Sequence, residues 1–175
     1  MVDGRIFICG RNTSNCLNLL EQETSCLNEF TDINIARSAI GYAKIVEMLI
    51  TGNETFIRTD KNQLYQIGGI SYTDSSPLGY VREIKCLKDK NISKLYHWHH
   101  RELKRILFCV SHADSILYQY NIESETLLQV KFSKFTLHWF GITQKNHEYQ
   151  WWATSDNGEI YRANKHKGHT VPTEW

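Results

Sequence analysis

The stretch Ser155-Asp156-Asn157-Gly158-Glu159-Ile160-Tyr161-Arg162-Ala163-Asn164 decides the fold, because it carries the strongest short-range signal for a β-hairpin. An Asn-Gly pair between two apolar arms can take a positive φ at both central positions of a two-residue hairpin turn. The arm before the turn holds Trp151-Trp152-Ala153, and the arm after it holds Ile160-Tyr161. The stretch therefore predicts two antiparallel strands joined by a type I′ turn at Asn157-Gly158.

The same phrase recurs three more times along the chain. Each copy has a turn pair, one variable residue, an aliphatic, an aromatic, two variable residues, and then Gly or Asn. The copies span residues 3–10, 61–68 and 114–121, and their aromatics are Phe7, Tyr65, Tyr118 and Tyr161. Successive aromatics lie 43 to 58 residues apart, close to the length of one propeller blade. Apolar arms precede three of the turns, so we predict a repeat of hairpins.

Composition narrows the class of protein. The 175 residues are 41% hydrophobic and 12% aromatic, which suits one globular β-rich protein. A net charge of +1 implies neither nucleic acid nor a membrane surface as a partner. The first residues lack the basic and apolar pattern of a signal peptide, so we expect an intracellular protein, cytoplasmic or nuclear. Five cysteines with no Cys-x-x-Cys pair favour reduced thiols over a disulfide framework or a zinc site.

Most of the chain resembles a known repeat family, and the resemblance is specific in two stretches, residues 4–19 and 45–68. Gly10, Asn12 and Leu17 match the Gly-x-Asn-x-x-Gly-Gln-Leu-Gly loop of the repeats of the regulator of chromosome condensation, with Asn15 and Asn18 at two glycine positions and Cys16 at the Gln position. Residues 45–60 are similar to the family's strand, turn, strand and acidic turn, with Glu54 where the family has His. Asn tolerates a positive φ nearly as well as Gly, so the loop path can survive these changes.

The resemblance implies an all-β, propeller-like array of about three to four four-stranded blades. We predict repeats over residues 1–164, in units of about 8–68, 69–121 and 122–164, followed by a tail at 165–175. Two arrangements fit this number of units. Either the chain closes as a small four-bladed ring, with the strand at 5–9 completing the last blade, or an incomplete propeller docks its open edges onto another subunit. We favour the second, because the chain begins and ends with the same half of a repeat.

The resemblance also carries an expectation of function. The family uses its loops to bind proteins, and its founding member exchanges nucleotide on a small GTPase. We predict a non-enzymatic protein-protein interaction module, a scaffold or subunit of a complex, without a cofactor. The alternatives are an exchange or regulatory factor for a small GTPase, and a tectonin-type binding propeller, which residues 152–162 also resemble. Motifs of nucleophilic, phosphate-binding and dinucleotide-binding enzymes are missing from the sequence, and neighbouring residues such as Ser111 and His112 point apart on a strand.

Several residues are candidates for binding sites. The cluster His97-Trp98-His99-His100, followed by Arg101, would put His97 and His99 on one face of a strand. We favour a protein-contact patch there over a metal site, because no third ligand stands nearby, and we add Trp175 as a candidate contact. We predict that Trp98, Trp139, Trp151 and Trp152 pack in the core between blades rather than stack on bases. Asp60, Asp114 and Asp156 fit turn chemistry better than calcium binding.

Overall fold

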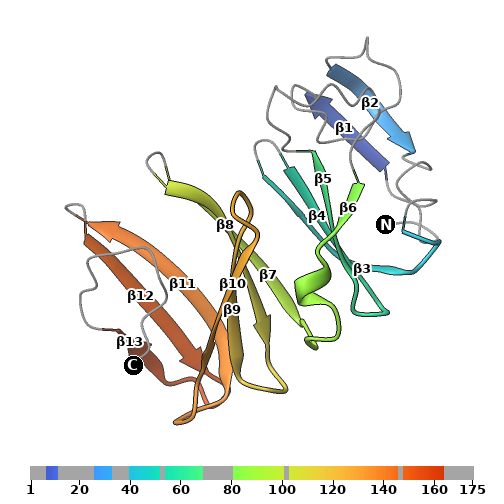
Figure 1. The fold of residues 1–175 in the computed structure, drawn as a ribbon. Coiled ribbons are helices and arrows are strands. Elements are labelled where there is room, and N and C mark those ends of the chain that lie inside the picture. Colours follow the sequence, from blue (N-terminus) through green and yellow to red (C-terminus); the bar gives the residue numbers. More distant parts are fainter. Residues whose placement is uncertain are drawn as a thin grey trace. The chain divides into compact units, whose positions relative to one another are not determined.

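The computed structural model describes residues 7–11, 26–32, 40–51, 54–68, 81–100, 103–145 and 148–163. This part of the chain contains thirteen β-strands and a single 3₁₀ helix, so the all-β prediction is confirmed (Figure 1). The chain divides into two compact units, Met1–Asp89 and Lys90–Trp175. Each unit holds two antiparallel sheets.

The first unit contains a two-stranded and a four-stranded sheet. In the small sheet, β1 (Phe7–Arg11) pairs with β2 (Cys26–Asp32). The larger sheet has the order β3-β4-β5-β6, with β3 (Ile45–Ile50), β4 (Glu54–Thr59), β5 (Leu64–Gly68) and β6 (Val81–Glu83). The 3₁₀ helix η1 (Lys85–Leu87) follows and buries Leu87. The apolar run Ile45–Ile50 predicts a buried strand, and this prediction is wrong: β3 lies at the edge of its sheet, and most of its residues are half-buried or exposed.

The second unit contains a four-stranded and a three-stranded sheet. The first has the order β10-β9-β8-β7, with β7 (Lys94–His100), β8 (Leu103–Ser111), β9 (Ile116–Asn121) and β10 (Thr126–Lys131). The second has β11 (Leu137–Lys145), β12 (Glu148–Ser155) and β13 (Ile160–Arg162). Among the described residues no strand of one sheet pairs with a strand of another, and no closed ring is detected.

The three described copies of the turn phrase occupy equivalent places in their sheets. In the two four-stranded sheets it connects the second strand to the third, β4 to β5 and β8 to β9, and it connects β12 to β13 in the same way. Strands therefore pair with their neighbours in the chain, as consecutive hairpins require. Each repeat unit predicted from the turns ends after the third strand of a sheet. The exact boundaries of the repeat units stay a prediction.

The turn type differs from the prediction. Ser155 and Glu159 close the hairpin through the bond from Ser155 N–H to Glu159 O at 3.0 Å, which leaves three loop residues rather than two. The Gly158 N–H donates to Ser155 O at 3.1 Å, and only Gly158 has a positive φ, of 88°. A type I turn followed by one left-handed residue is the usual three-residue loop. The type I′ turn is therefore wrong, because the register adds one residue to the loop.

The other two described copies repeat this left-handed residue. Asn62 has a φ of 59° and Ser115 a φ of 52°, each at the second position of its turn pair, where Gly158 stands in the last copy. Asn adopts this conformation more readily than other residues with a Cβ, and Gly adopts it without steric cost. The sequence phrase thus marks one backbone requirement, a single left-handed residue before the third strand.

A buried hydroxyl also recurs, directly before each turn, and the sequence analysis missed it. Thr59, Ser111 and Ser155 are all buried, with exposed fractions of 2% or less. Thr59 Oγ1 accepts from the Gln63 N–H at 3.3 Å, and Ser155 Oγ accepts from the Glu159 N–H at 3.1 Å. Extending the phrase upstream by three residues would have found this signal, since Ser and Thr side chains commonly bond backbone groups in turns.

Replacing Gly158 with Val should destabilise the second unit by about 1–2 kcal/mol, because a β-branched residue resists a left-handed backbone. An added Cβ would meet no atom within 4 Å, so the effect comes from the backbone alone. Urea denaturation followed by tryptophan fluorescence measures it. Gly158→Asn is the matched control, since Asn62 holds the equivalent position, and it should cost much less. Equal midpoints for Gly158→Val and the wild type would contradict this account.

Each sheet has two faces, which the turn phrase allows us to name. The leading face carries the aliphatic residue of the phrase, Leu64, Leu117 or Ile160. The trailing face carries the aromatic, Tyr65, Tyr118 or Tyr161. Directly paired residues share a face, and successive residues of a strand alternate between the faces. The register therefore assigns all remaining paired residues of a sheet to one of these two faces.

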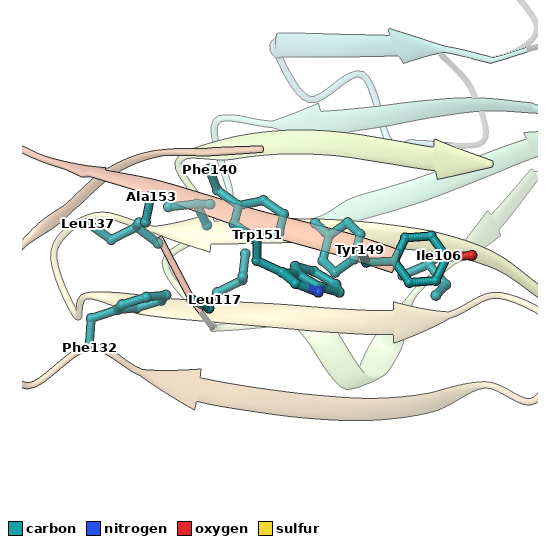
Figure 2. Packing of buried hydrophobic residues seen from close by; sticks show 11 residues of the cluster. Ile106, Leu117, Phe132, Leu137, Phe140, Tyr149, Trp151 and Ala153 are labelled. Carbon is teal, nitrogen blue, oxygen red and sulfur yellow. The ribbon is translucent and has the colours of Figure 1, made fainter. Parts of the chain in front are cut away.

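The core of the second unit forms where two sheets meet face to face. The leading face of β7–β10 contributes Phe108 and Leu117, and the trailing face of β11–β13 contributes Phe140 and Trp151. Figure 2 shows Leu117, Phe140 and Trp151 close together in this core. The Phe108 ring centroid lies 5.0 Å from that of Phe140 and 5.9 Å from the Trp151 ring, which it meets edge to face. Tilted and edge-to-face rings are the preferred aromatic arrangements. The interface between these two sheets is therefore formed by the leading face of one sheet and the trailing face of the next.

The first unit shows the same relation between its sheets. Ile57, Tyr65 and Ile67 lie on the trailing face of β3–β6 and form a buried cluster. Leu27 of β2 packs against this cluster and pairs directly with Gly10 of β1. Gly10 is three residues after Phe7, the aromatic of the first phrase copy, so Gly10 and Leu27 belong to the leading face of β1–β2. Again a leading face packs on the following trailing face.

A buried polar network lies on the leading face of β3–β6. Gln66 Nε2 donates to Glu54 Oε1 at 2.7 Å, and Arg82 Nη2 donates to Gln66 Oε1 at 2.6 Å. Glu54 and Gln66 have exposed fractions of only 1% and 3%. A buried carboxylate needs such partners because its charge is otherwise costly to remove from water. Gln66 therefore links an acidic and a basic side chain across three strands.

Candidate functional site

The leading face of β11–β13 is the most prominent exposed apolar surface in the second unit. The pairings Trp152 with Arg162, and Thr154 with both Ile160 and Trp139, bring these five side chains onto one face. Ile160 has an exposed fraction of 71% and Trp139 one of 45%. We call Trp139, Trp152, Ile160 and Arg162 the C-terminal face. Exposed aromatic and aliphatic groups around a basic side chain are typical of protein-contact surfaces.

Local contacts hold the two indoles of the C-terminal face in place. Trp139 lies over Gly141, where a Cβ would collide with its ring, so glycine permits this position. Trp152 Nε1 donates to Thr143 Oγ1 at 3.1 Å. The guanidinium carbon of Arg162 lies 5.7 Å from the centroid of the Trp152 ring, within cation–π range. The face is therefore formed by positioned side chains before any partner binds.

Comparison of the repeats shows why this face is unusual. Leu64 and Leu117, which hold the position of Ile160 in the other sheets, have exposed fractions of 1% and 0%. Phe56 and Phe108, which hold the position of Trp152, are buried too. The sheet β11–β13 also has no fourth strand beside β13 among the described residues. Positions that are core in two repeats are thus surface in the third.

The turn beside the C-terminal face carries a coupled acid and phenol. Tyr161 Oη donates to Glu159 Oε2 at 2.6 Å, and this bond lowers the pKa of Glu159, with a smaller contribution from Asn157. The same bond raises the pKa of Tyr161. Tyr161 also stacks on Phe135, with ring centroids 3.8 Å apart. The bond therefore favours the ionised Glu159 and the protonated Tyr161 in the folded hairpin.

Tyr161→Phe should return the pKa of Glu159 towards its ordinary value of 4.5, because it removes the donor and keeps the ring on Phe135. A ¹³C NMR titration of the Glu159 carboxyl measures this shift. The lowered pKa means that the bond's stabilisation is present above pH 4.5 and is lost as the pH falls through the folded-state pKa. Tyr118→Phe is the control and should leave Glu159 unchanged. An unaltered Glu159 titration in Tyr161→Phe would refute the assignment.

The predicted contact patch lies at the end of an edge strand. His97, Trp98, His99 and His100 are the last residues of β7, which confirms the predicted strand there, and a register irregularity separates Trp98 from His100. His97 is half-buried and pairs with Leu107. The side chains of Trp98, His99 and His100 lie outside the described part of the structure, as do Arg101 and Trp175. A contact role for these six residues stays a prediction.

The tryptophans do not share one environment. Trp151 is completely buried in the core of the second unit, as predicted. The core prediction is wrong for Trp139, which is exposed, and Trp152 is half-buried at the C-terminal face. Adjacent strand residues point to opposite faces, so Trp151 and Trp152 could not both enter the same core. That alternation is the sequence signal that separates them.

The residues around Ser111 and the metal-ligating side chains can be compared with the geometry of catalytic and metal sites. Ser111 Oγ donates to Asp114 Oδ2 at 2.7 Å, but His112 Nε2 bonds the carbonyl oxygen of His138 at 2.9 Å. The histidine therefore does not bridge the serine and the aspartate, as a catalytic relay requires. Within the described ranges no group of three metal-ligating side chains gathers. The described cysteines, Cys9, Cys26, Cys86 and Cys109, form no disulfide bond.

The 3₁₀ helix is far too short to cross a bilayer, and the described residues contain no helix with the length and apolarity of a membrane span. No protein-family model matches this chain, and no curated protein is significantly similar to it in sequence.

Proposed function

We propose that this chain is a non-enzymatic protein-interaction module built from propeller-type repeats, and that the C-terminal face is its binding surface. The fold supports the repeat part of this proposal: four-stranded sheets made of consecutive hairpins are the units from which propeller blades are built. The resemblance of residues 4–19 and 45–68 to the chromosome-condensation-regulator repeats agrees with it. A scaffold or complex subunit is the corresponding role.

One observation carries the proposal, namely the 71% exposure of Ile160 at a position that is buried in the other two repeats. An aliphatic residue in that position normally contributes to a sheet-on-sheet core, as Leu117 does. Leaving it in water forgoes about 1.5–3 kcal/mol of hydrophobic stabilisation. A partner that covers Ile160, Trp139 and Trp152 together would recover this free energy on binding.

Affinity purification from cell extract tests the proposal. We expect wild-type protein to retain a protein partner at a fixed stoichiometry, and Ile160→Asp to lose it. Val46→Asp is the matched control, because Val46 is also an exposed aliphatic residue, on another sheet. Retention of the same partner by Ile160→Asp would remove the C-terminal face from the binding surface.

The alternative of a nucleotide-exchange factor is tested separately. We expect no acceleration when the protein is incubated with a panel of small GTPases loaded with fluorescent nucleotide. Accelerated release from any member of the panel would replace the scaffold proposal with the regulatory one. The measurement does not depend on knowing which residues contact the GTPase.

A further inference from the structure

We propose that the partner of the C-terminal face is a second copy of this chain, which binds through the trailing face of its β1–β2 sheet. This inference rests on the proposed function and names its partner. It follows from the rule by which the sheets pack within each unit, and from two exposed faces, one in each unit, to which that rule assigns no cover.

The packing rule supplies the kind of partner. In the second unit the leading face of β7–β10, with Phe108 and Leu117, is covered by the trailing face of the next sheet, with Trp151 and Ala153. In the first unit Leu27, on the leading face of β1–β2, packs on the trailing face of β3–β6. The C-terminal face is a leading face, and it therefore fits a trailing face of the same repeat.

The β1–β2 sheet presents such a trailing face. Phe7 holds the aromatic position of the first phrase copy, which in β5 is Tyr65. Asp32 pairs directly with Phe7, and alternation along β2 places Phe30, two residues earlier, on the same side, beside the register irregularity between the Thr31 and Leu27 pairs. Phe7 has an exposed fraction of 38% and Phe30 one of 74%. We call Phe7, Phe30 and Asp32 the N-terminal face.

The two faces are complementary in chemistry as well as in repeat position. Both are aromatic: Trp139 and Trp152 on one, Phe7 and Phe30 on the other. Arg162 stands beside Trp152 on the C-terminal face, and Asp32 stands beside Phe7 on the N-terminal face, where alternation along β1 also places Arg11. A contact with the N-terminal face lets Arg162 meet Asp32, whereas the association of two C-terminal faces would bring only arginines together.

A contact between two different faces is heterologous, so a bound pair of copies still offers one free face of each kind, to which further copies can add. We therefore expect an assembly that grows with concentration rather than one that stops at a symmetric dimer. Light scattering coupled to size-exclusion chromatography should show masses above one chain. A wild-type protein of constant single-chain mass across the accessible concentrations would overturn the proposal.

Two single substitutions make the test specific. Ile160→Asp disables the C-terminal face and leaves the N-terminal face intact, and Phe30→Asp does the reverse. Both residues are exposed, so each variant should fold, which circular dichroism checks. Each variant alone should be monomeric, with self-association weakened at least about thirtyfold, as expected for the loss of one central apolar anchor. Ile50→Asp, at another exposed apolar position, should associate like the wild type.

Mixing the two variants gives the decisive result. Each variant supplies the face that the other lacks, so the mixture should form a 1:1 complex with the mass of two chains and nothing larger. A mixture that stays monomeric, or a Phe30→Asp protein that still self-associates, would overturn the pairing of these faces. If the wild type is monomeric but still retains a different protein through Ile160, the second-copy inference fails while the proposed function stands. Loss of both self-association and Ile160-dependent binding would refute both.

Discussion

Trp151→Ala is expected to destabilise the second unit by about 3–5 kcal/mol, the usual cost of truncating a buried aromatic side chain to alanine. The indole is completely buried and contacts Phe108 and Phe140, with its ring 5.6 Å from that of Phe140. The cavity would open between the two sheets, and the surrounding side chains would fill it only in part. Because the substitution also removes a fluorophore, far-ultraviolet circular dichroism in urea should be used to measure the loss.

Trp139→Ala is the matched control for that experiment. It removes the same side chain from the same sheet, but from the exposed C-terminal face. We expect a loss below about 1 kcal/mol, as for surface substitutions in general. Similar losses for the two variants would contradict the assignment of Trp151 to the core and Trp139 to the surface.

Gln66→Leu should destabilise the first unit by about 2–3 kcal/mol. Leucine is nearly isosteric with glutamine, so the change leaves little cavity. The buried Glu54 loses a hydrogen-bond donor, however, and the half-buried Arg82 loses an acceptor. Leaving such groups with fewer partners costs more than the hydrogen bonds contribute when they are formed. Hydrogen exchange of the Phe56 and Ile67 amides reports on this sheet, and it should quicken in the variant.

Gln129→Leu is the control for Gln66→Leu, because Gln129 is exposed on β10. It should leave both the free energy of unfolding and the exchange of the Phe56 amide essentially unchanged. A Gln66→Leu protein as stable as this control would show that the Glu54–Gln66–Arg82 network contributes nothing to folding.

Much of the fold was accessible from the sequence because the information is local. The apolar runs before and after each turn phrase fix the strands, and β4, β8 and β12 lie where those runs predicted them. The turn type was not fixed, since Asn-Gly fits both a type I′ turn and a type I turn with one left-handed residue. Only the pairing of Ser155 with Glu159 decides between them.

The candidate site was hidden for a different reason. Leu64, Leu117 and Ile160 are interchangeable in the phrase, and each reads as a core residue on its own strand. Whether such a residue is buried depends on a second sheet, which local sequence does not encode. The predicted contacts around His97 came from residue chemistry alone, whereas the C-terminal face emerges only when equivalent positions of different repeats are compared.

The pairing of each strand with its chain neighbour has a consequence for how the protein forms. Among the described residues the widest paired separation is that of Phe7 and Asp32, so the chain never closes a long loop to make a sheet. Low contact order favours fast folding. Each sheet can form as soon as its last strand leaves the ribosome, and the next sheet can then condense on a surface that already exists. A destabilising substitution should also affect mainly its own sheet and the neighbouring sheets, as in repeat proteins whose units contact only their neighbours.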